Sequence, residues 1–296
     1  MLDLKFGTDP EYFSSVKFKG KDFAISPALL EKDSGLKYIL EDVEEKHPIY
    51  ILEKDFSWMM DGVAWELTVR KPLKSASEMF KILTESTYVL SQFLSQFKWN
   101  GMNLNFYRKP AIRLNPEWYI PYININKVYQ GFIFGCDPDD DAIVQNYICK
   151  TRNVLNHNWR YGGGHIHVSG IPEFHSFPKE SILFLATTVG NYCIANSPYP
   201  ELEKKRVLTY GRPGRYREQF YPNGDIGVEY RSPSNSWTSF SEEQMEELFY
   251  FINRGCEFLT KSRQDIIEKY LNPTIVAITQ ANIELAKSIL NDIVKE

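Results

Sequence analysis

Apolar side chains recur at helical spacing in two internal parts of the chain. Residues 75–97 form the clearest predicted helix, because Ser75 and Glu78 match a capping box and the apolar positions after them follow one helical face. A second helix is expected from Pro178 to about Ala195, since proline is tolerated in the first turn of a helix. Both apolar stripes are predicted to face the core.

From residue 239 to the end, the pattern is helical throughout. One apolar stripe precedes Pro273, and another follows it from Ile275 to Ile293. No motif typical of catalysis or binding falls in this part. The sequence therefore predicts a helical C-terminal part, residues 241–296.

Alternation of polar and apolar residues predicts strands in the sheet-bearing part, residues 1–240. The clearest strands cover residues 2–13, 63–70, 165–168, 215–217 and 227–231. Residues 14–56 are expected to form short strands and loops, with His47 on the surface, and a buried strand is predicted at residues 132–136. No repeat or linker divides the chain, so the expected fold class is a single α+β domain.

Carboxylates occur within two of these strands. Asp9 and Glu11 flank Pro10 and are expected to share a face at a strand edge or bulge. Glu66 lies in the middle of a strand, where a carboxylate is costly unless it is paired or bound to a cation. We interpret the three acids as candidate metal ligands; the alternative is that acids at a strand end are merely solvated.

Two histidines follow three glycines in the segment Gly162–Val168. His165 and His167 are predicted to point to the same face of a strand, while Ile166 points to the opposite layer. The glycines would let a ligand approach the backbone. The pair therefore suits a metal or a nucleotide, although two satisfied polar residues on a half-buried strand would give the same pattern.

Arginines are concentrated after the second helix. Arg215 and Arg217 share one predicted strand face, Glu229 and Arg231 share another, and Arg206 and Arg212 precede them. Planar guanidinium groups bind phosphate or carboxylate bidentately, so this arginine cluster is interpreted as an anion-binding site. The alternative is a surface ladder of ion pairs.

An acidic stretch at residues 137–141 resembles the start of a calcium-binding EF-hand loop. Asp137, Asp139 and Asp141 match its first ligand positions, but Ala142 replaces the required glycine and Ile148 replaces the bidentate glutamate. We therefore reject calcium and expect a solvated turn or a loop at the mouth of a site.

Bulk properties exclude several classes of function. The net charge is −4 and no long basic run occurs, so non-specific binding to nucleic acid or membranes has no electrostatic support. The four cysteines are far apart, which argues against a zinc knuckle or a disulfide scaffold. No signal peptide or spanning segment is recognised, and a cytoplasmic location is expected.

Oxygen-rich ligands with few imidazoles favour Mg²⁺ or Mn²⁺ over zinc. Divalent ions beside arginines are typical of phosphoryl transfer, in which positioning and charge neutralisation supply most of the catalysis. The chain contains no P-loop pattern, so any ATP site is of another type.

The order of these motifs resembles that of glutamine synthetase-like ligases, and more specifically the phage-type amidoligases (COOH–NH2 ligase, type 2). The likeness extends over nearly the whole chain up to Trp237. It is carried by the following segments: Gly7–Glu11, Gly135–Pro138, Gly163–His167, Tyr210–Arg212 and Glu229–Trp237.

The resemblance implies a curved, mainly antiparallel sheet whose concave face holds divalent ions, ATP and two substrates. It implies that Asp9, Glu11 and Glu66 ligate metal, and that His165 and Glu229 share a second ion. His167 and Arg212 would contact the nucleotide, and the γ-phosphate and the acyl phosphate would be held by Arg215, Arg217 and Arg231. Asp9 stands where glutamine synthetases have glutamate, so its shorter side chain is expected to reach metal through water.

The function expected from the resemblance is an ATP-dependent ligase that joins a small-molecule or peptide carboxylate to an amine through an acyl phosphate. The alternatives are a metal-dependent hydrolase using His165 and His167, and a non-catalytic binding module. ATP consumption that depends on an amine would identify the ligase. Zinc retained through purification would favour the hydrolase, and the absence of both would favour the binding module.

Overall fold

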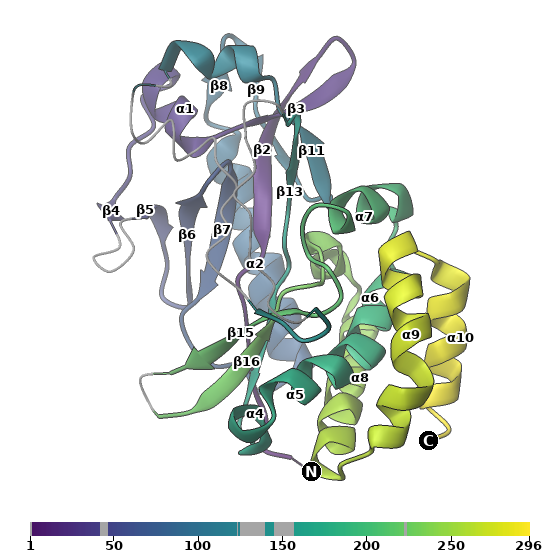
Figure 1. Cartoon of the computed structure of the whole chain (residues 1–296). Helices are drawn as coiled ribbons and strands as arrows, with labels where there is room; N and C mark the ends of the chain where they lie inside the picture. Colours follow the sequence, from purple (N-terminus) through teal and green to yellow (C-terminus); the bar gives the residue numbers. More distant parts are fainter. Residues whose placement is uncertain (1, 42–46, 123, 125–139, 145–156, 222–223) are drawn as a thin grey trace.

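The computed structural model describes residues 2–41, 47–122, 124, 140–144, 157–221 and 224–296 (Figure 1). The expected α+β class is confirmed, as are the mainly antiparallel strand pairing and the helical C-terminal region. The predicted strand at residues 132–136, and Asp137 and Asp139 of the acidic stretch, lie outside the described residues.

The smaller main sheet combines strands from distant parts of the sequence. Its order is β1 (Lys5–Thr8), β14 (Ile166–Ser169), β16 (Ile226–Tyr230), β15 (Arg215–Phe220) and β12 (Asp140–Asp141). All four pairings are antiparallel, and β14 lies directly beside β16. The histidine strand and the Glu-x-Arg strand are therefore neighbours.

The larger sheet carries the second group of acids and has nine strands. Along the sheet the order is β13 (Trp159–Tyr161), β11 (Ala111–Arg113), β3 (Lys21–Ile25), β2 (Glu11–Phe18), β7 (Ala64–Val69), β6 (Phe56–Asp61), β5 (Pro48–Leu52) and β4 (Leu40–Glu41), while β10 (Asn105–Tyr107) pairs with β2. Among the described pairings in this sheet, β11 with β3 is parallel and the others are antiparallel. A separate two-stranded sheet joins β8 (Lys98–Trp99) to β9 (Met102–Asn103).

The expected strand at residues 2–13 is two strands. The chain leaves the smaller sheet after Thr8 and enters the larger one at Glu11, so the break falls at Asp9–Pro10. Pro10 has no N–H to donate to a ladder, but its carbonyl accepts from Leu67 N at 3.1 Å. Because of this break, Asp9 lies next to the smaller sheet, whereas Glu11 is the first residue of a strand in the larger sheet.

Helices cover the apolar face of the smaller sheet. Ile166, Val168, Val228 and Tyr230 are buried on this face, and Phe6 meets Phe249 with ring centroids 4.4 Å apart. The helices concerned are α4 (Glu173–Ser176), α5 (Pro178–Leu185) and α8 (Glu242–Thr260). Figure 1 shows α5 and α8 beside this sheet, with α9 (Gln264–Gln280) and α10 (Ile283–Ile293) farther out.

The larger sheet packs against α2 (Ala76–Leu94), the helix predicted at residues 75–97. The Trp58 indole donates to the Ser86 carbonyl at 3.1 Å, and the Trp65 and Phe93 rings lie 5.9 Å apart. Ser75 caps the helix as predicted, but the Glu78 carboxylate accepts from Lys74 N instead of closing the capping box on Ser75.

The helix predicted from Pro178 to about Ala195 is confirmed, and two other helix predictions need correction. The helix predicted from Pro178 contains a π-helical turn at Ala186–Gly190 before α6 (Asn191–Ala195). Pro273 lies inside α9, and the C-terminal break falls at Ala281, which has a left-handed φ of 50°. The stretch expected to hold only strands and loops contains α1 (Pro27–Asp33), which Ser26 caps by accepting from Ala28 N.

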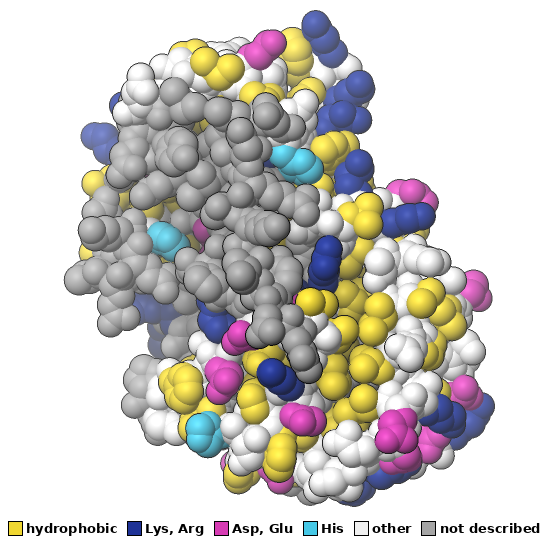
Figure 2. Space-filling model, viewed as in Figure 1, with side chains coloured by type: hydrophobic (Ala, Val, Ile, Leu, Met, Phe, Trp, Pro, Cys, Tyr) yellow, Lys and Arg dark blue, Asp and Glu magenta, His cyan; other side chains and the backbone are white. Residues whose placement is uncertain are grey.

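In the described part of the chain, the helices are too short or too polar to cross a membrane. Charged side chains of both signs are interspersed over the face shown in Figure 2. Basic side chains gather at its upper right.

Candidate metal and anion site

Strand register aligns three of the predicted site residues on one face of the smaller sheet. His167 on β14 is opposite Glu229 on β16, and Glu229 is opposite Arg217 on β15. Gly7 on β1 completes this row by pairing with His167. Directly opposite residues point to the same face, so a histidine, a glutamate and an arginine stand side by side.

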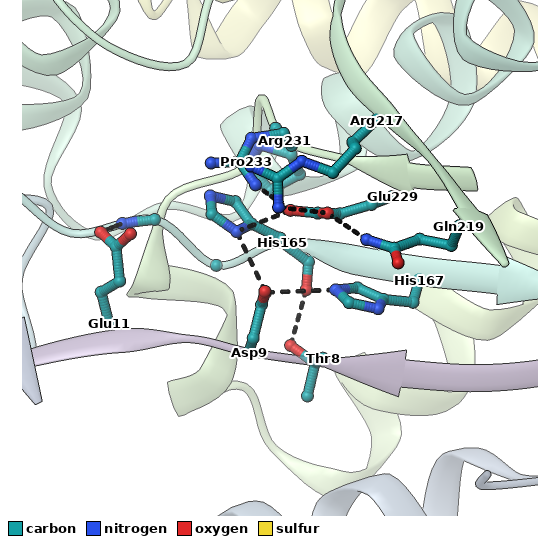
Figure 3. A network of polar contacts seen from close by, with 12 residues as sticks. Thr8, Asp9, Glu11, His165, His167, Arg217, Gln219, Glu229, Arg231 and Pro233 are labelled. Carbon is teal, nitrogen blue, oxygen red and sulfur yellow. Dashed lines mark hydrogen bonds and ion pairs between the residues drawn. The ribbon is translucent and has the colours of Figure 1, made fainter. Parts of the chain in front are cut away.

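A second row lies two residues farther along the same face. It contains Asp9 after β1, His165 before β14 and Arg231 after β16. Arg215 on β15 belongs to it because Arg231 N donates to the Arg215 carbonyl at 2.9 Å. Because strand side chains alternate, both rows face the same side. Figure 3 shows the side chains that it labels from these rows converging: Asp9, His165, His167, Arg217, Glu229 and Arg231. The predicted shared face of His165 and His167 is confirmed.

Asp9 and Glu229 meet the two imidazoles at short range. His165 Nδ1 is 3.0 Å from Asp9 Oδ1 and 3.2 Å from Glu229 Oε1, and His167 Nε2 is 3.3 Å from Asp9 Oδ1. Thr8 Oγ1 donates to the His165 carbonyl at 2.7 Å, which fixes the backbone at this point.

Glu229 is the centre of the charged cluster and is fully buried, with 0% exposure. It forms an ion pair with Arg231, accepts from Gln219 Nε2 at 2.6 Å and lies 3.6 Å from Arg217. Arg231 is buried, but the Arg217 side chain is 34% exposed. Arg217 therefore links the buried charges to the surface.

Asp9, His167 and Glu229 form a donor set that fits a divalent cation. One ligand atom from each lies within 4.8 Å of the others. Apart from these ion-pair contacts, Asp9 Oδ1, His165 Nδ1 and His167 Nε2 are buried without a hydrogen-bond partner, and a shared cation would satisfy all three atoms. Two carboxylates with imidazole nitrogen suit Mg²⁺ or Mn²⁺.

A group of acidic residues lies beside the donor set of Asp9, His167 and Glu229. Glu66 on β7 is opposite Glu11 on β2, and Asp61 ends the neighbouring strand β6. Burial, then repulsion from Asp61 and Asp9, raises the pKa of Glu66 well above its usual value. Burial and Glu11 raise the pKa of Asp61 to about 6, and nearby His47 and Arg231 oppose this rise. The sequence did not single out Asp61. His47, which was predicted to be a surface residue, is partly exposed.

In the group formed by Asp9, Glu229 and His165, the pKa values of the two carboxyl groups are lowered and the pKa of the imidazole is raised. Burial would raise the pKa of Asp9, but the two imidazoles hold it well below its usual range. Burial and Asp9 would raise the pKa of Glu229, yet His165 and Arg231 lower it to about 2. Burial and Arg231 oppose protonation of His165, whereas Asp9 and Glu229 raise its pKa to about 9.

These shifts predict that the metal-free protein loses stability as pH rises from 5 to 9. The pKa of His165 is raised from 6.5, so its contribution is complete below pH 6.5 and is lost as pH rises through about 9. The pKa of Asp61 is raised from 3.8, so its contribution is lost as pH rises through about 6. Thermal unfolding in EDTA across this range should show a falling melting temperature.

Asp61→Asn provides the control for this pH dependence. Because the amide does not ionise, the variant should lose the part of the decline below about pH 6 and keep the part between pH 6.5 and about 9. A melting temperature that rises from pH 5 to 9 in the metal-free wild type would contradict the assignment.

The glycines before His165 serve packing within the protein, in contrast to the expected approach of a ligand. A Cβ at Gly162 would collide with the Asn235 side chain, and one at Gly163 with the His165 ring. At Gly164 it would meet the Ser234 carbonyl and the Trp237 indole. The absence of side chains thus lets the histidine strand fit against the segment Ser232–Trp237.

The segment Ser232–Trp237 fastens the two sheets together. Asn235 Nδ2 donates to the Glu11 carbonyl at 2.7 Å, and Trp237 Nε1 donates to the Gly164 carbonyl at 2.8 Å. The Glu11 carboxylate accepts from Gly163 N at 2.7 Å, and Glu11 N donates to the Gly163 carbonyl at 2.9 Å.

Helix α7 (Pro200–Val207) supports this segment through Arg206, which belongs to the predicted arginine cluster, and through Glu203, which the prediction missed. Glu203 Oε1 accepts from the hydroxyls of Ser197, Ser234 and Ser236 at 2.8, 2.6 and 2.6 Å. Arg206 donates to the carbonyls of Ser232 and Pro233 at 2.7 and 3.0 Å. The sequence offered one signal, the arginine-rich composition around Arg206, but no pattern pointed to Glu203.

Three other residues named in the sequence analysis, Arg212, Arg215 and Asp141, differ from one another in exposure and contacts. The Arg212 side chain is exposed, and its backbone carbonyl accepts from Ser232 Oγ. Arg215 is buried opposite Asp141 of β12. Asp141 accepts from Ile143 N and Val144 N at 2.9 and 3.0 Å, so its carboxylate caps a turn. This agrees with the expectation of a turn in place of a calcium-binding loop.

No family model matches the chain, and no curated protein matches it.

Proposed function

We propose that the protein is an ATP-dependent carboxylate–amine ligase that uses Mg²⁺ or Mn²⁺. The observation that carries the proposal is the row His167–Glu229–Arg217 on adjacent strands. This row places side chains that can ligate a cation beside guanidinium groups on one face of the sheet, an arrangement that phosphoryl transfer requires. The substrates would be a small-molecule or peptide carboxylate and an amine.

Each residue has a role that follows from its position. Asp9, His167 and Glu229 would hold the cation, which would neutralise phosphate charge when bound. Arg217 can reach a bound anion because its side chain is partly exposed, while Arg231 holds Glu229 in place and presents a planar donor fork. Glu66, expected from the resemblance to ligate metal with Asp9 and Glu11, lies outside this donor set and forms a neighbouring buried acidic group with Asp61.

The arginines distinguish the ligase from the hydrolase alternative. Hydrolysis by a metal-bound water requires few cations other than the metal itself. Arg217 and Arg231 converge on Glu229 within the same cluster (Figure 3), and Arg215 lies in the neighbouring row. Such a concentration favours a ligand with several negative charges, such as a nucleotide phosphate or an acyl phosphate.

Trapping with hydroxylamine tests the proposal. The protein would be incubated with ATP, Mg²⁺, hydroxylamine and a panel of amino acids and short peptides, and the hydroxamate products detected by mass. We expect ADP release that requires both a carboxylate and hydroxylamine, because hydroxylamine attacks an acyl phosphate as an amine would. EDTA should abolish it.

Three outcomes would count against this function. ATP hydrolysis independent of carboxylate and amine would indicate no ligation. Zinc retained through purification, with cleavage activity in the absence of ATP, would favour the hydrolase. No consumption of ATP with any member of the panel would favour a binding module.

A further inference from the structure

Tyr210 connects two residues that belong to different sheets. Its hydroxyl donates to Glu11 Oε1 at 3.1 Å, at the start of β2, and lies 3.0 Å from His165 Nε2, just before β14. No role for the Tyr210 hydroxyl was predicted from the sequence, although Tyr210–Arg212 was one of the motifs singled out there. The link lies beside the donor set formed by Asp9, His167 and Glu229.

The end of α7 places Tyr210 firmly. Tyr210 N donates to the Arg206 carbonyl at 2.7 Å, and the Arg206 guanidinium lies 4.9 Å from the centre of the Tyr210 ring. Gly211 has a left-handed φ of 75°, and a Cβ there would collide with the Arg206 guanidinium. The motif therefore shapes a turn that holds a tyrosine hydroxyl between a carboxylate and an imidazole.

The direction of the hydrogen bonds determines where the His165 ring carries its proton. A carboxylate only accepts, and the two Glu11 oxygens accept from Gly163 N at 2.7 Å and from the Tyr210 hydroxyl. The single hydroxyl hydrogen of Tyr210 is thus used on Glu11. Its oxygen can only accept from His165, so Nε2 of the imidazole must carry a hydrogen.

We propose that Glu11 and Tyr210 together fix His165 in the Nε2–H form. Neutral His165 then presents an Nδ1 lone pair to the cation held by Asp9 and Glu229, whose oxygens are 3.0 and 3.2 Å from Nδ1. Binding the cation releases at most the Nδ1 proton and leaves the Tyr210 contact intact. Glu11 is therefore a positioning residue that acts through Tyr210, in contrast to the direct metal ligation expected from the resemblance.

The surroundings of Glu11 support this role. The residue is 5% exposed, and both of its carboxylate oxygens already accept hydrogen bonds from protein groups. Its main chain is held as well, by the Gly163 carbonyl and the Asn235 amide. The inference rests on the metal-binding part of the proposed function and is independent of ATP and of amide formation.

Tyr210→Phe is the first test, in protein with ¹⁵N-labelled histidines. The Nε2–H group of His165, protected from exchange by Tyr210, should give a proton–nitrogen cross-peak in the metal-free wild type, and this peak should disappear in the variant. Affinity for Mn²⁺ alone, measured by electron paramagnetic resonance, should fall by about 10- to 100-fold, the usual effect of removing a group that orients a metal ligand.

Tyr192→Phe is the matched control. Tyr192 donates to Glu247 Oε2 at 2.7 Å, far from the site in the helical region, so this variant also loses a tyrosine–glutamate hydrogen bond. It should keep the His165 cross-peak and bind Mn²⁺ as the wild type does. A fall in Mn²⁺ affinity equal to that of Tyr210→Phe would overturn the inference.

Glu11→Gln separates the positioning role from direct ligation. Gly163 N still needs an acceptor, so the glutamine would turn its oxygen to Gly163 and its NH2 group to Tyr210. The Tyr210 hydrogen would then point to Nε2, and His165 should switch to the Nδ1–H form. The double variant that combines Glu11→Gln with Tyr210→Phe should bind Mn²⁺ no more weakly than the single variant with the lower Mn²⁺ affinity, because the two residues act as one unit.

Two results would overturn the inference: an unchanged His165 cross-peak in Tyr210→Phe, or additive losses of Mn²⁺ affinity in the double variant. The second would mean that Glu11 ligates the ion independently. A third outcome separates the two proposals. If the wild type binds no Mn²⁺, but the His165 cross-peak disappears in Tyr210→Phe, the role of Tyr210 is supported and the proposed metal site is contradicted.

Discussion

Replacing Arg231 by lysine is expected to lower turnover by more than about tenfold while the protein stays folded. Arg231 is 5% exposed, pairs with Glu229 and continues the β16 pairing through its backbone N–H. Lysine keeps the positive charge next to Glu229, which preserves the fold. It loses the planar fork, so it cannot hold Glu229 and a phosphate or acyl oxygen at the same time.

Turnover would be followed as hydroxamate formation in the presence of ATP and Mg²⁺, with unfolding temperature as the measure of folding. Arg254→Lys is the matched control, because Arg254 pairs with Glu257 on α8 at 2.9 Å, outside the site. This half-exposed pair should tolerate lysine with little change. Turnover close to that of the wild type in Arg231→Lys would mean that Arg231 only neutralises Glu229.

The large helices and the strands could be predicted because their patterns are long. The periodic stripe of α2 and the helical pattern after residue 239 were sufficient to locate these elements. The errors lie where tertiary packing outweighs local preference. Pro273 is accommodated within α9, and the strand expected at residues 2–13 divides at Pro10 because its two halves pair with different sheets.

The site could be predicted in part, for a physical reason. Side chains two apart in a strand share a face, so the groupings of His165 with His167 and of Glu229 with Arg231 follow from the sequence alone. Which strands lie side by side depends on pairings between distant residues, which local alternation does not encode. Asp61 was missed because it stands at the end of a strand, and the role of the Tyr210 hydroxyl was missed because Tyr210 follows a helix, where no periodicity marks it.

The glycines illustrate how one residue type allows opposite readings. A backbone without side chains permits the close approach of a ligand or of another part of the same chain. At Gly162–Gly164 the neighbours are Asn235, the His165 ring and Ser234. Only the position of the distant segment Ser232–Trp237 decides between the two possibilities.

Glu229→Gln is expected to abolish most of the binding of Mn²⁺, and with it most of the activity. Glu229 is a buried carboxylate in the donor set with Asp9 and His167, and glutamine keeps its size while removing the charge. The glutamine NH2 group would also face donors, namely Arg231 and Gln219. A lower melting temperature in EDTA should therefore accompany the loss of binding.

A double-variant cycle tests whether one ion is shared. If Glu229 and His167 bind the same cation, Glu229→Gln combined with His167→Ala should weaken Mn²⁺ binding little more than the worse single variant, since residues that act as a unit are non-additive. His175→Ala, which removes an exposed imidazole on α4, should add nothing to either. Glu229→Asp keeps the charge on a shorter side chain and should recover part of the affinity. Fully additive losses would place Glu229 and His167 in separate sites, and the row of strand-paired residues that supports the proposed ligase would then have no common ligand.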